Sequence, residues 1–270
     1  MDIPVAKPPW KKLGRHLESV CRKALFEYEM LDGEAKLAVA LSGGKDSLAL
    51  LFFLHAISGK GFPPFKLYAL HVRGAFSCGA GIEWGFLKII CQKLNIPLII
   101  KESSIKEKNL SCYPCSRLRR RLLFDAAKEE GIKTIAFGHH RDDNAQTLLL
   151  NMLHKGEVTG LLPKIFMIDY EITIIRPLIL ASEEEIRQFA KDYGFIRTTC
   201  QCPYGQRSMR KKVDQAISHL EGLFPNIRQN LSHASLIYGS DKASSKQLKE
   251  SKSMHSTSRI GISAEPKPNS

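Results

Sequence analysis

Leu37-Ala-Val-Ala-Leu-Ser-Gly-Gly-Lys-Asp-Ser47 decides the fold. Its first five residues are an unbroken apolar run, which is typical of a buried strand. A long apolar segment follows from Ser47 to Ile57 and predicts a buried helix. Residues 42–47, called the glycine loop below, join the two elements. A strand, a glycine turn and a helix in this order form the first unit of a parallel α/β sheet.

The same alternation continues along the chain. We therefore expect the α/β class, as a doubly wound parallel sheet with an N-terminal helix and a helical C-terminal part. The further strands are expected at Leu67–Val72, Pro97–Lys101, Thr134–Phe137 and Ile172–Ile175, with a hairpin or irregular region before the last. The further helices are expected at Trp10–Leu31, Glu83–Leu94, Ser116–Glu130, Asp142–Leu153, Ser182–Tyr193 and Ser208–Leu223.

Composition and pattern divide the chain into three parts. Residues 1–34 are expected to be an N-terminal helical segment, residues 35–225 the catalytic domain, and residues 226–270 a C-terminal extension. After about residue 239 the sequence is rich in Ser, Lys, Gly and Pro and has few large apolar side chains. Such a segment cannot bury enough apolar surface to fold, so we expect it to be disordered.

The chain is strongly basic. Its 270 residues include 40 Lys and Arg against 27 Asp and Glu, a formal charge of +13, which favours a polyanionic partner such as nucleic acid. No apolar run approaches the roughly 20 residues that cross a bilayer. The first ten residues also lack the apolar core of a secretory signal. We therefore expect a cytoplasmic protein with no membrane partner.

The glycine loop has the composition of a phosphate site. Gly43 and Gly44 let backbone amides approach an anion, and the dipole of the following helix favours negative charge there. The loop lacks the spacing of a Walker motif. The alternative is a tight turn in which Ser42 or Ser47 only caps the helix.

A second polar segment, Gly138-His-His-Arg-Asp-Asp143, lies between an expected strand and an expected helix. A doubly wound sheet binds its ligands at this edge. The alternative is that Asp142 or Asp143 caps the helix, while His139 and His140 are ordinary loop residues.

The cysteines are grouped in a way that suggests a metal. Seven cysteines in a reducing compartment do not form a disulfide framework, but Cys112 and Cys115 are three apart, and Cys200 and Cys202 are two apart. Three interpretations remain open: a structural zinc site with four thiolates, a 4Fe-4S cluster held by three thiolates, and a redox dithiol that carries sulfur as a persulfide.

The loop pattern Ser-Gly-Gly-x-Asp-Ser resembles the PP-loop ATP pyrophosphatases, whose fold is of the adenine nucleotide alpha hydrolase type. That resemblance implies that ATP and Mg²⁺ bind here, that AMP is transferred to a substrate oxygen, and that pyrophosphate is released. It assigns phosphate binding to Ser42, Gly43, Gly44, Lys45 and Ser47. It also implies that Asp46 holds the metal together with Asp142 or Asp143, and that Gly138 and His139 line the nucleotide site.

Several separated motifs are similar to those of the tRNA 2-thiocytidine synthetase family. They are Trp10-Lys-Lys-Leu, the glycine loop, Cys112-x-x-Cys115-Ser-Arg-Leu-Arg-Arg, Gly138–Asp143, Thr147-Leu-x-x-Asn-Met, Arg176-Pro-Leu and the late cysteines. The resemblance implies adenylation of the C2 oxygen of cytidine 32 in tRNA and its replacement by sulfur. Cys112, Cys115 and a later cysteine would hold a 4Fe-4S cluster. Cys202 is preferred as the third ligand, because related thiolases have Cys-Pro here, and Cys200 is the alternative.

The expected partners are tRNA, a sulfur donor such as a cysteine desulfurase, and a second copy of the chain in a homodimer. Basic residues of the expected helix 116–130 and of residues 207–212 are expected to contact RNA phosphates. Two rival functions differ in their metal content. A lysidine-type modifier would share the loop and need no metal, and a basic RNA-binding protein would carry a structural zinc site.

Overall fold

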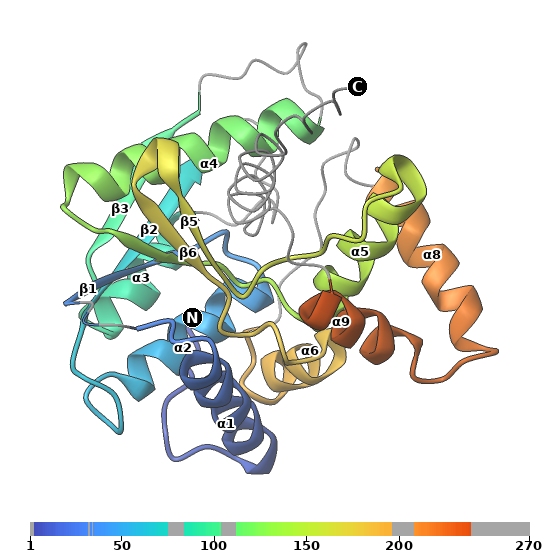
Figure 1. The fold of residues 1–270 in the computed structure, drawn as a ribbon. Helices are drawn as coiled ribbons and strands as arrows, with labels where there is room; N and C mark the ends of the chain where they lie inside the picture. Colours follow the sequence, from blue (N-terminus) through green and yellow to red (C-terminus); the bar gives the residue numbers. More distant parts are fainter. Residues whose placement is uncertain are drawn as a thin grey trace, which may run out of the picture.

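The computed structural model describes residues 3–31, 33, 35–74, 84–103, 112–195 and 208–238 (Figure 1). Within them six strands form one sheet in the order β3-β2-β1-β4-β6-β5. The strands are β1 (Lys36–Ala40), β2 (Lys66–Arg73), β3 (Leu98–Glu102), β4 (Thr134–Ala136), β5 (Lys164–Met167) and β6 (Ile172–Ile175). The helices are α1 (Lys12–Glu27), α2 (Lys45–Ile57), α3 (Trp84–Lys93), α4 (Cys112–Glu129), α5 (Arg141–Lys155), α6 (Glu183–Asp192), α8 (Met209–Glu221) and α9 (Ile227–Tyr238).

The sheet is doubly wound, as the sequence predicts. Strand β1 pairs in parallel with β2 on one side and with β4 on the other. The strand order therefore reverses between β1 and β4, which is the switch point where such sheets bind ligands. The region before β6 is a hairpin, because β5 pairs antiparallel with β6 at the edge of the sheet.

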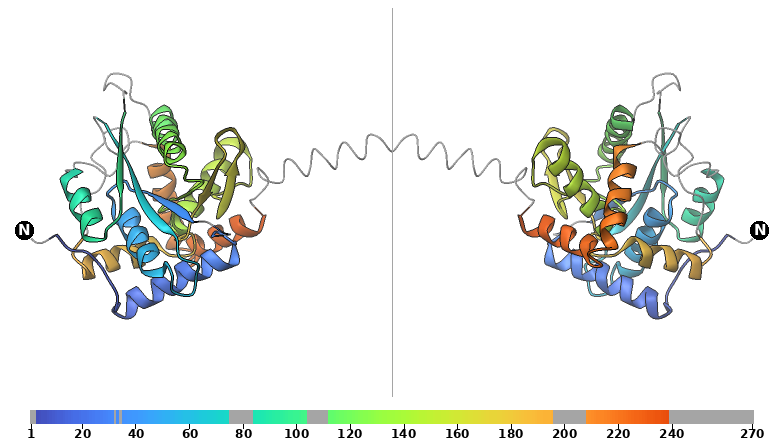
Figure 2. Two further views of the ribbon diagram at one scale, coloured as in Figure 1. Left: turned by 90° about the vertical axis from the view of Figure 1, so that its left-hand side faces the viewer. Right: turned by 90° about the vertical axis from the view of Figure 1, so that its right-hand side faces the viewer.

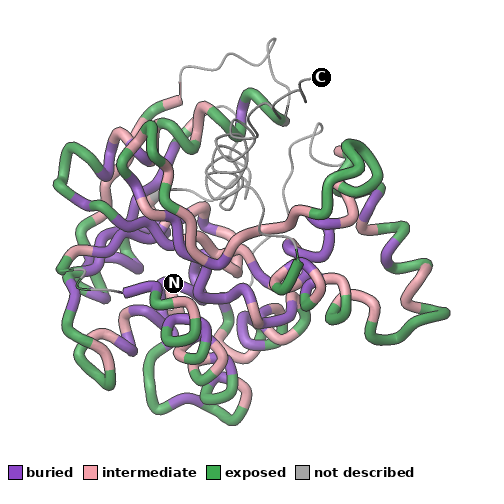
Figure 3. The backbone as a smooth tube through the Cα atoms, in the orientation of Figure 1, coloured by how far each residue is buried: buried purple, intermediate pink, exposed green. Residues whose placement is uncertain are grey.

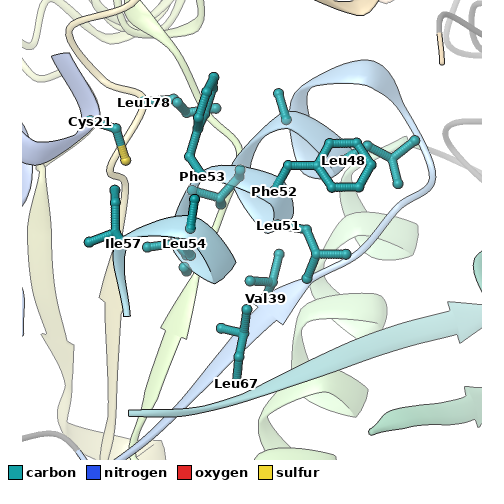
Figure 4. Close-up of a cluster of buried hydrophobic side chains, with 14 of the residues drawn as sticks. Cys21, Val39, Leu48, Leu51, Phe52, Phe53, Leu54, Ile57, Leu67 and Leu178 are labelled. Carbon is teal, nitrogen blue, oxygen red and sulfur yellow. The ribbon is translucent and has the colours of Figure 1, made fainter. Parts of the chain in front are cut away.

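Helices cover both faces of the sheet. Side chains of β1 alternate between two apolar clusters: Leu37 and Val39 pack with α1, α2, α3 and α6, whereas Ala38 packs with α4. Figure 2 shows α3 and α4 on opposite sides of the strands, and the strands at the centre are buried (Figure 3). The larger cluster is built around α2, whose Leu48, Leu51 and Phe53 are fully buried (Figure 4). This packing fixes the start of α2, and with it the glycine loop.

Helix α4 begins four residues earlier than the expected start at Ser116. The Cys-x-x-Cys motif does not precede this helix but forms its first turn. Pro114 is compatible with that position, because the amides of a first turn have no partner within the helix. Cys112 and Cys115 are thus separated by one helical turn.

Helix α9 was not predicted. It lies within residues 226–270, which the sequence suggested to be an extension, and it packs against α5 beside α8 (Figure 1). Asn144 of α5 is fully buried and joins the helices: its Nδ2 donates to Ser232 O and Oγ at 3.3 and 3.2 Å, while its Oδ1 accepts from Ser235 Oγ at 2.9 Å. The same Oδ1 accepts from the Leu161 amide at 2.7 Å. In the part of the chain that the structure describes, no helix has the length and apolar character of a membrane span.

Replacing Asn144 with Ala should destabilise this helical group. The variant leaves the Leu161 amide and the two serine hydroxyls without their buried partner, so we expect the free energy of unfolding to fall by about 2–4 kcal/mol in urea titrations. Gln188→Ala is the control, because Gln188 bonds Asp192 on the exposed face of α6. Its loss should stay within about 0.5 kcal/mol. Equal effects of the two variants would contradict the role assigned to Asn144.

Candidate functional site

The glycine loop leaves the start of α2 free to bind an anion. Gly43 has φ +86°, a conformation that favours glycine, and Gly44 is the N-cap residue of α2. No side chain caps this helix. The alternative role of Ser42 or Ser47 as a cap is therefore wrong: Ser42 Oγ and Ser47 Oγ lie 3.1 Å apart and bond within the loop, Ser47 Oγ donating to Gly44 O at 3.0 Å. The amides of the first turn of α2 are left for a ligand.

Gly138 packs directly on this loop. A Cβ atom at Gly138 would lie 3.0 Å from Asp46 C and from Ser47 N, both backbone atoms. Only glycine lets the end of β4 come this close to the start of α2. This close approach joins the two polar segments that the sequence singles out.

A cavity of about 400 Å³ lies where the two segments meet. Six of the residues predicted for nucleotide or metal binding line it: Ser42, Asp46, Ser47, Gly138, His139 and Asp143. Its remaining lining is Ala40, Leu41, Leu70, Val72, Ser116, Arg119, Arg120, Leu123, Phe137 and Arg210. Gly43, Gly44, Lys45 and Asp142 are not among the lining residues. The cavity therefore joins the glycine loop, the end of β4, the second and third turns of α4, strand β2 and the start of α8.

Lys45 points toward carboxylates rather than into the cavity. Its Nζ lies 3.0 Å from Glu183 Oε1 and 3.1 Å from Asp46 Oδ1. Burial alone would lower the pKa of Lys45, but Asp46 and Glu183 raise it above its ordinary value. The lysine remains charged and ties the glycine loop to the start of α6. Lys45 and Glu183 are 138 residues apart in the sequence, so no local pattern predicts that they pair.

The two aspartates after β4 have different surroundings. Asp142 is buried and accepts a hydrogen bond from the Glu183 amide at 2.8 Å, so it stabilises the start of α6. Asp143 reaches the cavity and lies 3.4 Å from Arg210 Nη1. Burial alone would raise the pKa of Asp143, but the adjacent His140 and Arg210 hold its pKa at about 2. Of the pair, Asp143 is the one placed to act beside Asp46.

His140 is the N-cap of α5, and not the ordinary loop residue of the alternative interpretation. Its Nδ1 accepts from the Asp143 amide, and its own amide donates to Asp143 Oδ2 at 3.2 Å. The alternative that an aspartate caps the helix is confirmed in part: His140 is the N-cap residue, and the Asp143 side chain completes the capping box. The buried imidazole lies between the two cavity carboxylates, because its Nε2 is 3.4 Å from Asp143 Oδ2 and 3.8 Å from Asp46 Oδ1. The signal was a histidine followed three residues later by an acid, the spacing of a capping box.

His139 is held neutral at the cavity wall. Burial, followed by the nearby charge of Arg176, lowers the pKa of His139 to about 3. Its ring stacks on Phe137 with the ring centres 5.7 Å apart, and its buried Nδ1 has no hydrogen-bond partner among the described residues. A neutral imidazole can donate to or accept from a ligand in the cavity.

Only part of the predicted thiolate site is described. Cys115 is a buried free thiol in the first turn of α4, and the next residue, Ser116, lines the cavity. Cys112 lies one turn before it, although its side chain is not described. Cys200 and Cys202 lie outside the described residues. Among the residues with described positions, no group of three or more His, Cys, Asp or Glu side chains could hold a metal ion.

Comparisons with known proteins identify the family. Residues 13–199 match the PP-loop domain family. A tRNA-cytidine(32) 2-sulfurtransferase from Syntrophotalea carbinolica is 31% identical over 82% of this chain and 88% of its own. The protein of the same name from Legionella pneumophila is 33% identical over 78% of this chain and 77% of its own. The chain belongs to the tRNA-cytidine(32) 2-sulfurtransferase family of PP-loop proteins.

The fold has a solved counterpart outside this sulfurtransferase family. The U34-tRNA thiolase NcsA from Methanococcus maripaludis, described with its 4Fe-4S cluster, superimposes with a TM-score of 0.67. The match covers 83% of this chain and 77% of the thiolase at 23% sequence identity. At that identity the likeness concerns the fold, which confirms the predicted PP-loop type.

Gly138→Ala should weaken ATP binding far more than stability. The new methyl group meets backbone atoms that cannot turn away, so the glycine loop must shift and lose its fit to phosphate. We expect at least a tenfold loss of Mg–ATP affinity in calorimetric titrations, since misplaced backbone donors lose charged hydrogen bonds. Gly85→Ala is the matched control, because a Cβ there meets no atom within 4 Å. Unchanged ATP affinity in Gly138→Ala would contradict this account of the loop.

The neutral state of His139 predicts a pH dependence of stability. Because its folded pKa of about 3 is below the unfolded value of about 6.5, the unfolded chain binds an extra proton between these pH values. The free energy of unfolding should therefore decrease as the pH falls below about 6.5. His139→Gln should make this decrease shallower in urea titrations at pH 7, 6 and 5. Burial also lowers the pKa of His71, so the contribution of His71 to the decrease should remain in the variant. An unchanged slope would exclude His139 as a source.

Proposed function

We propose that this protein is a tRNA sulfurtransferase that uses ATP to replace the C2 oxygen of cytidine 32 with sulfur. One observation carries the proposal: the glycine loop and the turn of α4 that follows Cys115 border the same cavity. A group that activates an oxygen and a group that handles sulfur must act on one carbon, so they must share one site. The names of the sequence relatives supply the nucleotide and its position.

The chemical obstacle is the leaving group, because oxide does not leave an amide-like carbon. In the first step the C2 oxygen bonds to the α-phosphorus of ATP, and the bond to pyrophosphate breaks. The amides of the glycine loop hold the phosphates and offset the developing charge on pyrophosphate. In the second step a hydrosulfide-level sulfur bonds to C2, the C2–O bond breaks with AMP as leaving group, and the sulfur loses its proton. The exchange is redox-neutral.

The carboxylates of the cavity fit Mg²⁺ by their chemistry. Asp46 and Asp143 offer oxygen ligands, which this cation prefers, and both lie within 4 Å of His140 Nε2. Asp46 Oδ1 is buried and accepts no hydrogen bond from the described residues, although Lys45 Nζ lies 3.1 Å away. These two residues would hold the metal with the ATP phosphates as further ligands. Asp142 is assigned the structural role of stabilising α6.

The thiolates of α4 fit an iron–sulfur cluster. Cys112 and Cys115 belong to the first turn of α4 and have the Cys-x-x-Cys spacing that iron–sulfur sites use. With Cys202, or Cys200 in its place, they would hold a 4Fe-4S cluster. The cluster would supply an open iron for sulfur provided by a partner such as a cysteine desulfurase. Leu70, Val72 and Leu123 form an apolar wall that limits water access to C2.

Cys112→Ala should abolish 2-thiocytidine formation and leave ATP binding intact, because the thiolate belongs to the sulfur step alone. Asp46→Ala should instead impair adenylation. We expect each variant to lose at least about a hundredfold in activity, measured by mass spectrometry of nucleosides from tRNA, with Mg–ATP affinity measured in parallel. Cys91→Ala is the control for cysteine loss, since this buried thiol lies in α3 outside the cavity.

The metal content of anaerobically purified protein separates the proposal from its rivals. A brown protein with iron and acid-labile sulfide that bleaches in air supports the sulfurtransferase. Stoichiometric zinc in a colourless, air-stable protein would favour the RNA-binding alternative, and absence of any metal would favour lysidine-type chemistry. Wild-type activity in Cys112→Ala or Asp46→Ala would remove the corresponding assignment.

A further inference from the structure

Three of the described arginines line the cavity. Arg119 donates to Val72 O at 2.8 Å, and the other two come from different helices. Arg120 extends from α4 and Arg210 from the first turn of α8, and both belong to its lining. Within the described part of the chain, Arg120 makes no hydrogen bond and no ion pair. With the same described residues, Arg210 makes long contacts, at 3.4 Å to Asp143 Oδ1 and 3.3 Å to Thr147 Oγ1. Neither guanidinium is held by the strong paired hydrogen bonds that arginine can form.

Positive charge is concentrated around these side chains. Arg120 is exposed as a residue, but partial burial of its guanidinium lowers its pKa. Tyr113 opposes this effect and Arg210 adds to it. Arg176, at the end of β6, is buried and has no carboxylate partner among the described residues; burial and Arg120 lower its pKa to about 10. Three guanidinium groups thus repel one another in this region, where Asp143 is the nearby counter-charge. Such an arrangement becomes favourable when an anion binds between the groups.

The location of the arginine pair favours RNA over ATP as the source of that anion. The glycine loop already offers helix-end amides for the phosphates of ATP. Arg120 and Arg210 are instead exposed at the rim of the cavity, with 46% of the Arg210 side chain accessible. A group at the rim can reach the backbone of a large substrate whose base enters the cavity.

We propose that Arg120 and Arg210 form a second phosphate site, which binds an RNA backbone phosphate next to the target nucleotide. This inference rests on the proposed function for the identity of the RNA. The paired guanidinium groups hold the backbone at the rim and thereby position the base inside. The site requires α4 and α8 to stay in place. The contacts of α8 with α5 hold α8, and the packing of α4 on β2 and β3 holds α4.

A double-mutant cycle between the arginines and one phosphate tests the proposal. The protein arms are the wild type and the Arg120→Gln/Arg210→Gln variant. The RNA arms are the natural tRNA and tRNA with a neutral methylphosphonate on either side of cytidine 32. We expect the variant to lose about tenfold or more in tRNA affinity and to reduce the salt slope by roughly one or two, because each contact releases counterions. The methylphosphonate adjacent to the site should weaken the wild type and add little to the variant.

Arg121→Gln is the matched control. It removes the same charge from α4, but Arg121 lies outside the cavity lining and 4.0 Å from Asp125. It should weaken binding by less and show full sensitivity to the methylphosphonate. Mg–ATP affinity is measured in parallel for every variant.

The outcomes separate this inference from the proposed function. The second phosphate site would be overturned if each methylphosphonate lowered the tRNA affinity of the double variant as much as that of the wild type. It would also be overturned if the double variant lost ATP affinity with unchanged tRNA affinity. Coupling between the arginines and the phosphate without any 2-thiocytidine formation by the wild type would support the site and reject the sulfurtransferase activity.

Discussion

The site depends on the contact between two backbones, that of Gly138 and that of Asp46–Ser47. Parallel pairing of β1 with β4 brings the ends of these strands to one edge, and the missing side chain at Gly138 lets them touch. The amides of α2 and the polar residues after β4 consequently face one cavity. The apolar packing of α2 holds one side of this contact, so the core and the ligand site share the same helix.

Charges in the site are arranged by several helices rather than by the loop alone. Lys45 is directed toward Glu183 on α6, and the imidazole of His140 lies between Asp46 and Asp143. These contacts hold two carboxylates together and prevent them from standing as unpaired like charges. The guanidinium groups that line the cavity come from α4 and α8, and that of Arg210 lies 3.4 Å from Asp143. The cavity therefore combines carboxylates suited to a cation with arginines suited to a polyanion.

The helical group α5, α8 and α9 links this chemistry to the rest of the molecule. Buried Asn144 holds α9 through hydrogen bonds to serines, and Gly160 lies so close that a Cβ would meet Ser235 Oγ at 1.8 Å. This interface is polar and closely packed. The position of α9 against α5 therefore depends on matched hydrogen bonds more than on an apolar stripe.

The sequence by itself determined the α/β class, the glycine loop, most helices and strands, and the family, because apolar runs and turn residues are local signals. Helix α9 was not predicted, because its buried serines give no apolar periodicity. The start of α4 at Cys112 was not predicted, because a proline between two cysteines is typical of a loop. Tertiary structure alone decided that Asp143 rather than Asp142 enters the cavity, and that Lys45 turns to Glu183. The side chains of neighbouring residues on a helix point about 100° apart, and only the packing of the helix against its neighbours decides which of them points into the cavity.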